Sequence, residues 1–296
     1  MEPRQFFTPK MDIIFKIVFG STRNEDILKD FLQSVLDIPA HEYQHIDITN
    51  PYISPEDLVG KSVILDIKVT TISGKIINIE MQVQQIPEMR ERMVFYASKM
   101  MEEQAKRGDE YSQLKKVINI VIADFRMIDE DEMYHILFLL HDERSGVTFS
   151  DIMEIHTLEL PKLPKEATAE DGQLLDWLRL FNAQSREEMA ELAERSLEMR
   201  KAVSIIEELN ADEQIRQMAE AAEKLRRDNA SRLSGAHREG KREGIEIGIE
   251  VGKREGIEVG KLIVAQKLLS LGVDIQQIAL ATELSVDEIA KLQKEE

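Results

Sequence analysis

Apolar and polar residues alternate through residues 61–84 as they do in a β-hairpin that buries one face. Successive side chains of a strand point to opposite faces, so the two halves must pair with their apolar positions on the same side. A two-residue loop would set apolar positions against polar ones. A three-residue loop, residues 72–74, avoids this, and Gly74 supplies the left-handed conformation that such loops favour. The predicted apolar face holds Leu65, Ile67, Val69, Ile77, Ile79, Met81 and Val83.

The same register places two carboxylates opposite each other on the polar face. Asp66 pairs with Glu80, beside the pair formed by Lys68 and Asn78, and the β-carbons of such pairs lie roughly 5 Å apart. Two carboxylates this close repel each other unless one is protonated or a cation bridges them. Oxygen ligands at this spacing suit Mg²⁺. The alternative is a simply solvated outer face of the sheet.

Other segments before residue 165 predict helices and strands in mixed order. Apolar residues recur at spacings of three and four in some segments, and β-branched residues are concentrated in others. Together with the hairpin, this pattern predicts a mixed α/β core. The predicted helices are residues 12–20, 25–37 and 88–108, and the further strands are residues 115–125, 134–141 and 152–160.

The rest of the chain is predicted to be an all-α extension of the core in residues 1–165. Pro161 and Pro164 mark the boundary, because proline continues neither a strand nor a helix. Residues 166–235 contain no proline and are rich in Ala, Leu, Glu, Lys and Arg, which favours helix. A glycine repeat in residues 236–261 then leads to a compact tail, residues 262–296.

Glycine occupies every fourth position from Gly240 to Gly260. Six glycines inside a helix cost about 6 kcal/mol relative to alanine, yet the surrounding sequence and its Glu and Lys content favour a helix. We predict a helix, with a flexible spacer as the alternative. On a helix the glycines would let a second helix approach closely along a right-handed path. The segment therefore indicates homo-oligomer formation through the C-terminal helical region.

The tail, residues 262–296, predicts three short helices. Gly272 should end the first, Asp274 should cap the second, and Ser285 should cap the third with Glu288 as its partner. This order resembles a helix-turn-helix. Its last helix is acidic, whereas a helix that contacts bases needs Arg, Lys, Asn or Gln, so we interpret the tail as a packing or assembly module.

The composition narrows the class of protein. The 296-residue chain has no cysteine, which excludes disulfides and cysteine zinc sites. No apolar run approaches the roughly 20 residues of a membrane span, and the amino terminus lacks the pattern of a signal peptide. We therefore expect a cytoplasmic protein without a membrane partner. The net charge of −18 argues against a broad basic surface for nucleic acid, although a cluster of metal-binding carboxylates is itself acidic.

The pentapeptide HEYQH, residues 41–45, matches the H-E-x-x-H pattern of zinc metallopeptidases. That chemistry needs both histidines on one face of a sustained helix. Pro39 precedes the motif and a strand-like segment, residues 46–53, follows it, which leaves room for barely one helical turn. We interpret the motif as a chance match.

Several motifs occur in order along the first part of the chain: MDIIFKIVFG, LDIKVTTISGKIINIEMQ, RMVFYASKM, KVINIVIADF and IHTLELPKL. As an ordered set they resemble the Rpn family of recombination-promoting nucleases, also described as PD-(D/E)XK nuclease family putative transposases. The resemblance covers roughly residues 8–165. It implies a restriction-endonuclease-like core, a mixed sheet flanked by helices, that cleaves DNA phosphodiester bonds with Mg²⁺ or Mn²⁺. Functions in recombination, mobile elements or phage defence are compatible with it.

The resemblance also implies roles for individual residues. Asp66 and Glu80 would bind the metal together with the backbone carbonyl of Met81. Gln82 stands where the general superfamily pattern has lysine, and a glutamine there is familiar in the Rpn-like group. Glutamine adds no positive charge, so Lys16 is the expected substitute.

Further candidates surround this site. Asp12 and Lys16 lie four residues apart and share a helix face, and Lys68 shares a strand face with Asp66. The alternative for the helical pair is an ordinary surface ion pair. Spacings of four and three place a further set on one face of the next helix, where it could contact a DNA phosphate or simply cover the sheet edge. This set is Arg92, Tyr96 and Lys99.

Two hypotheses about function follow. The first is a metal-dependent DNA endonuclease whose helical tail serves assembly or target choice. The second is a catalytically weak or inactive DNA-binding or scaffold protein on the same fold, which Gln82 and the acidic net charge favour.

Overall fold

The computed structural model describes residues 6–49, 67–105, 110–165 and 172–292. The chain forms two compact units, Met1–Glu220 and Ala221–Glu296. Among the described residues, none of the helices combines the length and the apolar character that crossing a membrane requires.

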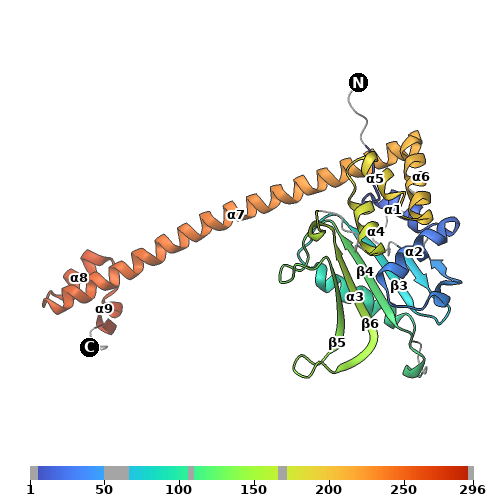
Figure 1. Cartoon of the computed structure of the whole chain (residues 1–296). Coiled ribbons are helices and arrows are strands. Elements are labelled where there is room, and N and C mark those ends of the chain that lie inside the picture. Colours follow the sequence, from blue (N-terminus) through green and yellow to red (C-terminus); the bar gives the residue numbers. More distant parts are fainter. Residues whose placement is uncertain (1–5, 50–66, 106–109, 166–171, 293–296) are drawn as a thin grey trace. The chain divides into compact units, whose positions relative to one another are not determined.

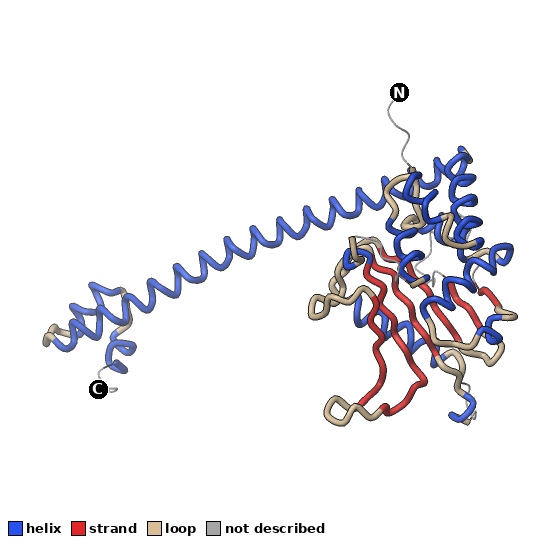
Figure 2. The backbone as a smooth tube through the Cα atoms, viewed as in Figure 1, coloured by secondary structure: helices blue, strands red, loops and turns tan. Residues whose placement is uncertain are grey.

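The described strands of the first unit form one mixed, six-stranded sheet in the order β1-β2-β3-β4-β6-β5 (Figures 1 and 2). Strands β1, β2 and β3 are antiparallel, β3, β4 and β6 are parallel, and β5 returns antiparallel to β6 at the edge. This is the mixed sheet that the sequence predicts. The strands are β1 (Asp47–Thr49), β2 (Ile67–Thr70), β3 (Ile76–Gln82), β4 (Val117–Ala123), β5 (His135–His141) and β6 (Thr148–Glu159).

Helices cover both faces of the central strands. On one face, α3 packs against Val117 and Val121 of β4. The alternate residues Ile118 and Ile120 point to the other face, into the main core that α1, α2, α4, α5 and α6 complete. The helices are α1 (Asp12–Phe19), α2 (Glu25–Val35), α3 (Met89–Glu102), α4 (Gln173–Asn182), α5 (Arg186–Leu192) and α6 (Leu197–Ala211).

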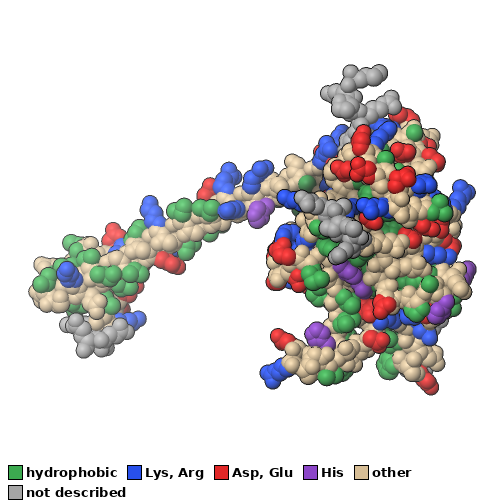
Figure 3. Space-filling model, viewed as in Figure 1, with side chains coloured by type: hydrophobic (Ala, Val, Ile, Leu, Met, Phe, Trp, Pro, Cys, Tyr) green, Lys and Arg blue, Asp and Glu red, His purple; other side chains and the backbone are tan. Residues whose placement is uncertain are grey.

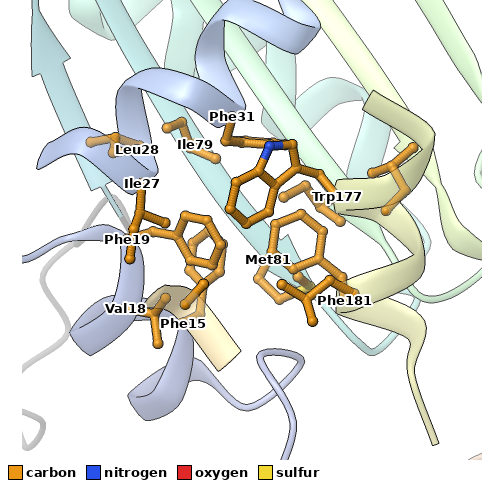
Figure 4. Packing of buried hydrophobic residues seen from close by; sticks show 14 of the residues in the cluster. Phe15, Val18, Phe19, Ile27, Leu28, Phe31, Ile79, Met81, Trp177 and Phe181 are labelled. Atoms are coloured by element: carbon orange, nitrogen blue, oxygen red, sulfur yellow. The ribbon is translucent and has the colours of Figure 1, made fainter. Parts of the chain in front are cut away.

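An aromatic cluster joins the N-terminal helices to α4 (Figure 4). The rings of Phe19 and Phe181 have centroids 5.2 Å apart, and those of Phe19 and Trp177 are 5.6 Å apart. Trp177 Nε1 also donates a hydrogen bond to Asp30 Oδ2 at 3.0 Å. Because α4 completes the core, the boundary predicted near residue 165 lies inside the first compact unit.

The observed hairpin has the predicted register. Lys68 pairs with Asn78, and the amide of Thr71 donates to the carbonyl of Lys75 at 3.0 Å across the three-residue loop. Gly74 has a φ of +86°, a conformation that other residues rarely adopt. The apolar set on β2 and β3 is buried in the main core, as the alternation predicts. Residues 61–66 of the predicted hairpin lie outside the described residues.

Glu42 of the HEYQH motif stabilises this loop. Its Oε1 accepts a hydrogen bond from Lys75 Nζ at 2.8 Å, and its Oε2 accepts one from the Ser73 amide at 3.1 Å. The motif begins in a single 3₁₀ turn (Ala40–Tyr43), and His41 and His45 are exposed. This geometry agrees with a chance match to the peptidase pattern.

The glycine repeat is helical. A continuous helix, α7 (Glu213–Ser270), includes all six tetrads, so the predicted helix is correct and the spacer alternative is not observed. The first short helix predicted for the tail is instead the end of α7, because nothing interrupts the helix before Gly272, which has a φ of +76°. The tail continues with α8 (Ile275–Thr282) and α9 (Val286–Leu292).

The predicted caps of the tail helices are present. Asp274 Oδ1 accepts a hydrogen bond from the Gln276 amide at 2.9 Å. Ser285 Oγ accepts one from the Glu288 amide at 3.2 Å, and Glu288 Oε2 accepts one from the Ser285 amide at 2.8 Å, which completes a capping box. A small core then joins these helices to the end of α7; its buried residues are Ala265, Ile278, Leu284 and Ile289.

We predict that Glu42→Gln lowers the free energy of unfolding by about 2 kcal/mol at pH 7, since it removes a charge-assisted hydrogen bond. The hydrogen bond from Lys75 lowers the pKa of Glu42 to about 2. A carboxylate with a lowered pKa stabilises the fold above its unfolded pKa, about 4.3, and that stability is lost as the pH falls towards 2. The difference between wild type and variant in urea unfolding should therefore shrink between pH 5 and pH 2.

The matched control is Glu25→Gln, which removes a partly exposed i,i+4 pair with Lys29. This change should cost less than about 0.5 kcal/mol. Equal effects of the two substitutions would contradict the role of Glu42.

Candidate active site

The polar face of β3 is buried beneath α3. Asn78 is fully buried and Glu80 is 2% exposed, while the alternate residues Ile79 and Met81 point into the main core (Figure 4). The alternative of a solvated outer face is therefore wrong for Asn78 and Glu80. The alternation of residues along β3 indicates which side chains share a face. The packing of α3 over the face of Asn78 and Glu80 shields that face from water.

A chain of side-chain amides holds the Glu80 carboxylate. Oε1 accepts a hydrogen bond from Asn78 Nδ2 at 3.0 Å, and Oε2 accepts one from Gln82 Nε2 at 3.1 Å. Asn78 Nδ2 also donates to Asn119 Oδ1 of β4 at 2.9 Å. Asn119 Nδ2 in turn donates to the carbonyl of Met93 in α3 at 3.0 Å. The amides fix the orientation of the carboxylate between the sheet and α3.

Two predicted site cations lie close enough to Glu80 to affect its charge. Burial raises the pKa of Glu80, while the amide hydrogen bonds and the charges of Arg92 and Lys16 act in the opposite direction. The raised pKa means that desolvation outweighs these favourable contacts. A cation that binds directly to Glu80 would favour its ionised form.

Lys16 and Asp12 form the pair that their spacing predicts. Lys16 Nζ lies 3.0 Å from Asp12 Oδ1 on one face of α1. The Lys16 side chain is only 12% exposed, whereas that of Asp12 is 56% exposed. Lys16 is therefore a largely desolvated cation near Glu80, and Asp12 lies at the solvent side of the pair.

Arg92 and Tyr96 also contact each other on α3. Arg92 Nε donates to the Tyr96 hydroxyl at 2.5 Å, and the guanidinium carbon lies 5.0 Å from the ring centroid. Tyr96 is buried and Lys99 is exposed. Lys68 Nζ binds Glu103 Oε2, just beyond the end of α3, at 2.8 Å.

Asn119 is a residue of the candidate site that was not predicted from the sequence. The sequence does carry a signal for it: Asn119 is the single polar residue in VINIVIA, a strand whose residues are all buried. A buried amide needs hydrogen-bond partners, so such a residue marks a polar contact inside the fold. Asp124 was also missed. Its amide donates to the carbonyl of Gln82 at 2.9 Å, and its Oδ1 accepts a hydrogen bond from Lys10 at 2.7 Å.

The predicted metal site is described only in part. Asp66 lies outside the described residues, so its pairing with Glu80 stays a prediction, as does the Met81 carbonyl ligand. In the part of the chain that the structure describes, no three His, Asp or Glu side chains come together as metal ligands would. Among these residues, the buried Asn78 Oδ1 receives no hydrogen bond.

Comparison with known proteins yields one family. The family model for PD-(D/E)XK nuclease family transposases matches residues 9–236. The match confirms the resemblance and extends it beyond residue 165 to include α4, α5 and α6. No curated protein and no solved structure matches the chain. Since the match spans more than half of the sequence, the chain belongs to the PD-(D/E)XK nuclease family transposases.

Proposed function

We propose that the protein is a metal-dependent endonuclease that hydrolyses DNA phosphodiester bonds at the polar face of β3. The observation that carries the proposal is the Glu80 carboxylate, which is buried on a central strand of a chain that belongs to a nuclease family. Two side-chain amides hold this carboxylate, and two cationic side chains lie close to it. A carboxylate in such surroundings is a common feature of functional sites.

The residues suit a divalent metal such as Mg²⁺ or Mn²⁺. If the described register, in which Ile67 pairs with Ile79, continued by one residue, it would give the Asp66–Glu80 pair that the sequence predicts. With the Met81 carbonyl, this pair would offer the hard oxygen ligands that Mg²⁺ prefers. Asn78 Oδ1, which accepts no hydrogen bond from the described residues, adds a further oxygen whose buried position favours a positive partner. When bound, the metal would lower the pKa of an attacking water and polarise the phosphate.

The side chains around Glu80 would orient its carboxylate, supply positive charge and contact the DNA. Gln82 donates its amide to Glu80, so we assign it to orienting the carboxylate rather than to activating water. Lys16 would supply the positive charge that lysine provides at the position of Gln82 in the general pattern, because it is desolvated and close to Glu80. Arg92, braced by Tyr96, would contact a DNA phosphate.

Lys68, Lys99 and Asp12 would support the site without binding the metal. Lys68 and Lys99 would attract the DNA backbone, and Asp12 would fix Lys16. We further propose a cytoplasmic protein that acts in DNA recombination, mobile elements or phage defence.

A second function has one specific observation in its favour. The Gln82 amide is already used by Glu80, and glutamine carries no charge with which to stabilise the transition state. A protein that binds DNA or acts as a scaffold without cutting it would be consistent with this arrangement. Cleavage by the wild-type protein separates the two functions.

We predict that wild-type protein cleaves plasmid DNA with Mg²⁺ or Mn²⁺ and loses this activity in EDTA. Asp66→Asn and Glu80→Gln should each lower the rate at least about a hundredfold, because each removes a metal-binding charge. The control Glu130→Gln removes an exposed carboxylate that pairs with Arg90 and should cleave normally. Circular dichroism would verify the fold of each variant.

Cleavage that persists at the wild-type rate in folded Glu80→Gln would contradict the proposed site. An inactive wild-type protein that still binds DNA would support the second function.

We predict that Lys16→Ala lowers kcat by roughly ten- to a hundredfold with little change in KM, since its charge acts chiefly on the transition state. Lys16→Arg should retain part of the activity. Lys29→Ala is the control, because Lys29 forms an equivalent i,i+4 pair on α2. A rise in KM at unchanged kcat would show that Lys16 only binds substrate.

A further inference from the structure

An exposed stripe that winds around α7 follows the glycine repeat, with apolar side chains beside the glycines. In each four-residue repeat, the residues directly before and after the glycine flank it on the helix surface. The remaining residue, two positions from the glycine, lies on the opposite side of the helix. Every residue opposite the glycines is charged. Figure 3 shows hydrophobic side chains at the surface of this helix. The exposed flanking residues, 52–66% accessible, are Ile245, Ile247, Ile249, Ile257 and Val259.

The described chain gives no reason for the glycines. A Cβ added at any of the six, Gly240 to Gly260, would meet no atom within 4 Å. Alanine would therefore fit at each position and would favour the helix. A helix without tertiary packing is marginal in water, and glycine makes it less stable still. Close approach by another helix explains both the glycines and the exposed apolar flanks.

We propose that α7 pairs in parallel and in register with α7 of a second copy of this chain, with the glycines at the contact. A repeat of four residues exceeds the 3.6 residues of a helical turn, so the two helices would wrap with a right-handed sense. Helices packed through glycines at this spacing cross at roughly −40°. That crossing lets the flanking side chains of the two copies meet on either side of the glycines.

Charge determines the orientation of the pair. The flank that follows each glycine carries Lys241, Lys253 and Lys261 as its charges within the repeat, and the flank that precedes each glycine carries Glu239, Glu243 and Glu255. In a parallel pair, the flank that follows each glycine in one copy meets the flank that precedes each glycine in the other copy. In an antiparallel pair, each flank instead meets the same flank of the other copy. Only the parallel pair places these lysines beside glutamates of the second copy rather than beside lysines.

The parallel pair also brings apolar flanking side chains of the two copies together. In the parallel pair Ile245 lies beside Ile247 of the second copy, and Ile249 lies beside Val251. Residues 238–261 carry six basic and six acidic side chains, although the whole chain has a net charge of −18. Self-association through this segment is therefore not opposed by its net charge.

Disulfide formation tests the orientation, because the chain contains no cysteine. Gly240→Cys and Gly256→Cys are made separately in the full-length protein and oxidised. In a parallel pair each variant forms a reducible dimer by itself, since identical positions lie within reach of a disulfide. The control Arg242→Cys faces away from the contact and should not cross-link. Cross-linking only in a mixture of the two glycine variants would indicate antiparallel helices and overturn the proposal.

Light scattering after gel filtration tests the number of copies. The wild-type protein should be a dimer, and a monomer or a larger oligomer would overturn the proposal.

The double variant Gly248→Ala/Gly252→Ala distinguishes a paired helix from a lone one. In a pair, the added methyl groups separate the helices and raise the dimer dissociation constant at least about tenfold. In a lone helix they would only raise its thermal midpoint. Lys241→Glu/Lys253→Glu should weaken the dimer similarly, and mixing it with Glu243→Lys/Glu255→Lys should restore association. Unchanged association in all of these variants would overturn the proposal.

Discussion

Burial of β3 on both faces is the constraint on which the rest of the first unit depends. One face inserts Ile77, Ile79 and Met81 into the main core, and the other carries Glu80 beneath α3. Removing a carboxylate from water costs several kcal/mol unless hydrogen bonds and opposite charges compensate. This cost accounts for the amides of Asn78 and Gln82 beside the carboxylate. A site built this way keeps its geometry because the strand that carries it cannot move without disturbing the core.

The main core extends this support beyond the sheet. Phe15 and Phe19 of α1 pack against Trp177 and Phe181 of α4, so the helix that carries Lys16 is held by a segment more than 150 residues away. The family match through residue 236 is consistent with this dependence. The helices after the sheet are therefore part of the unit that positions Lys16.

Much of the fold could be predicted because the signals are local. The alternation of apolar residues determines the hairpin register, with Lys68 opposite Asn78, and the caps at Asp274 and Ser285 mark helix starts. Burial of the polar face could not be predicted, since it depends on α3 packing across the sheet. Similarly, Trp177 reaches the core through contacts that no local pattern specifies. For the glycine repeat, the flanking residues predict the helix that is observed, but a flexible spacer stayed open as an alternative because the intrinsic preference of glycine opposes a helix.

For the candidate site, spacing alone predicts that Asp12 and Lys16 pair, as they do. It cannot reveal that Lys16 is desolvated or that the Gln82 amide is committed to Glu80. Both facts arise from neighbours distant in sequence, and both determine which chemistry each residue can perform.

The proposed pairing of α7 would have a consequence for the product of the proposed reaction. In the proposed dimer, a parallel pair of these 58-residue helices would tether two of the proposed catalytic units, so that after one unit acts the second would remain at a raised effective concentration near the same duplex. The second strand of a duplex could then be cut within the same encounter. The repeat of glycines would in this way govern whether the outcome is a nick in one strand or a break in both strands of the duplex.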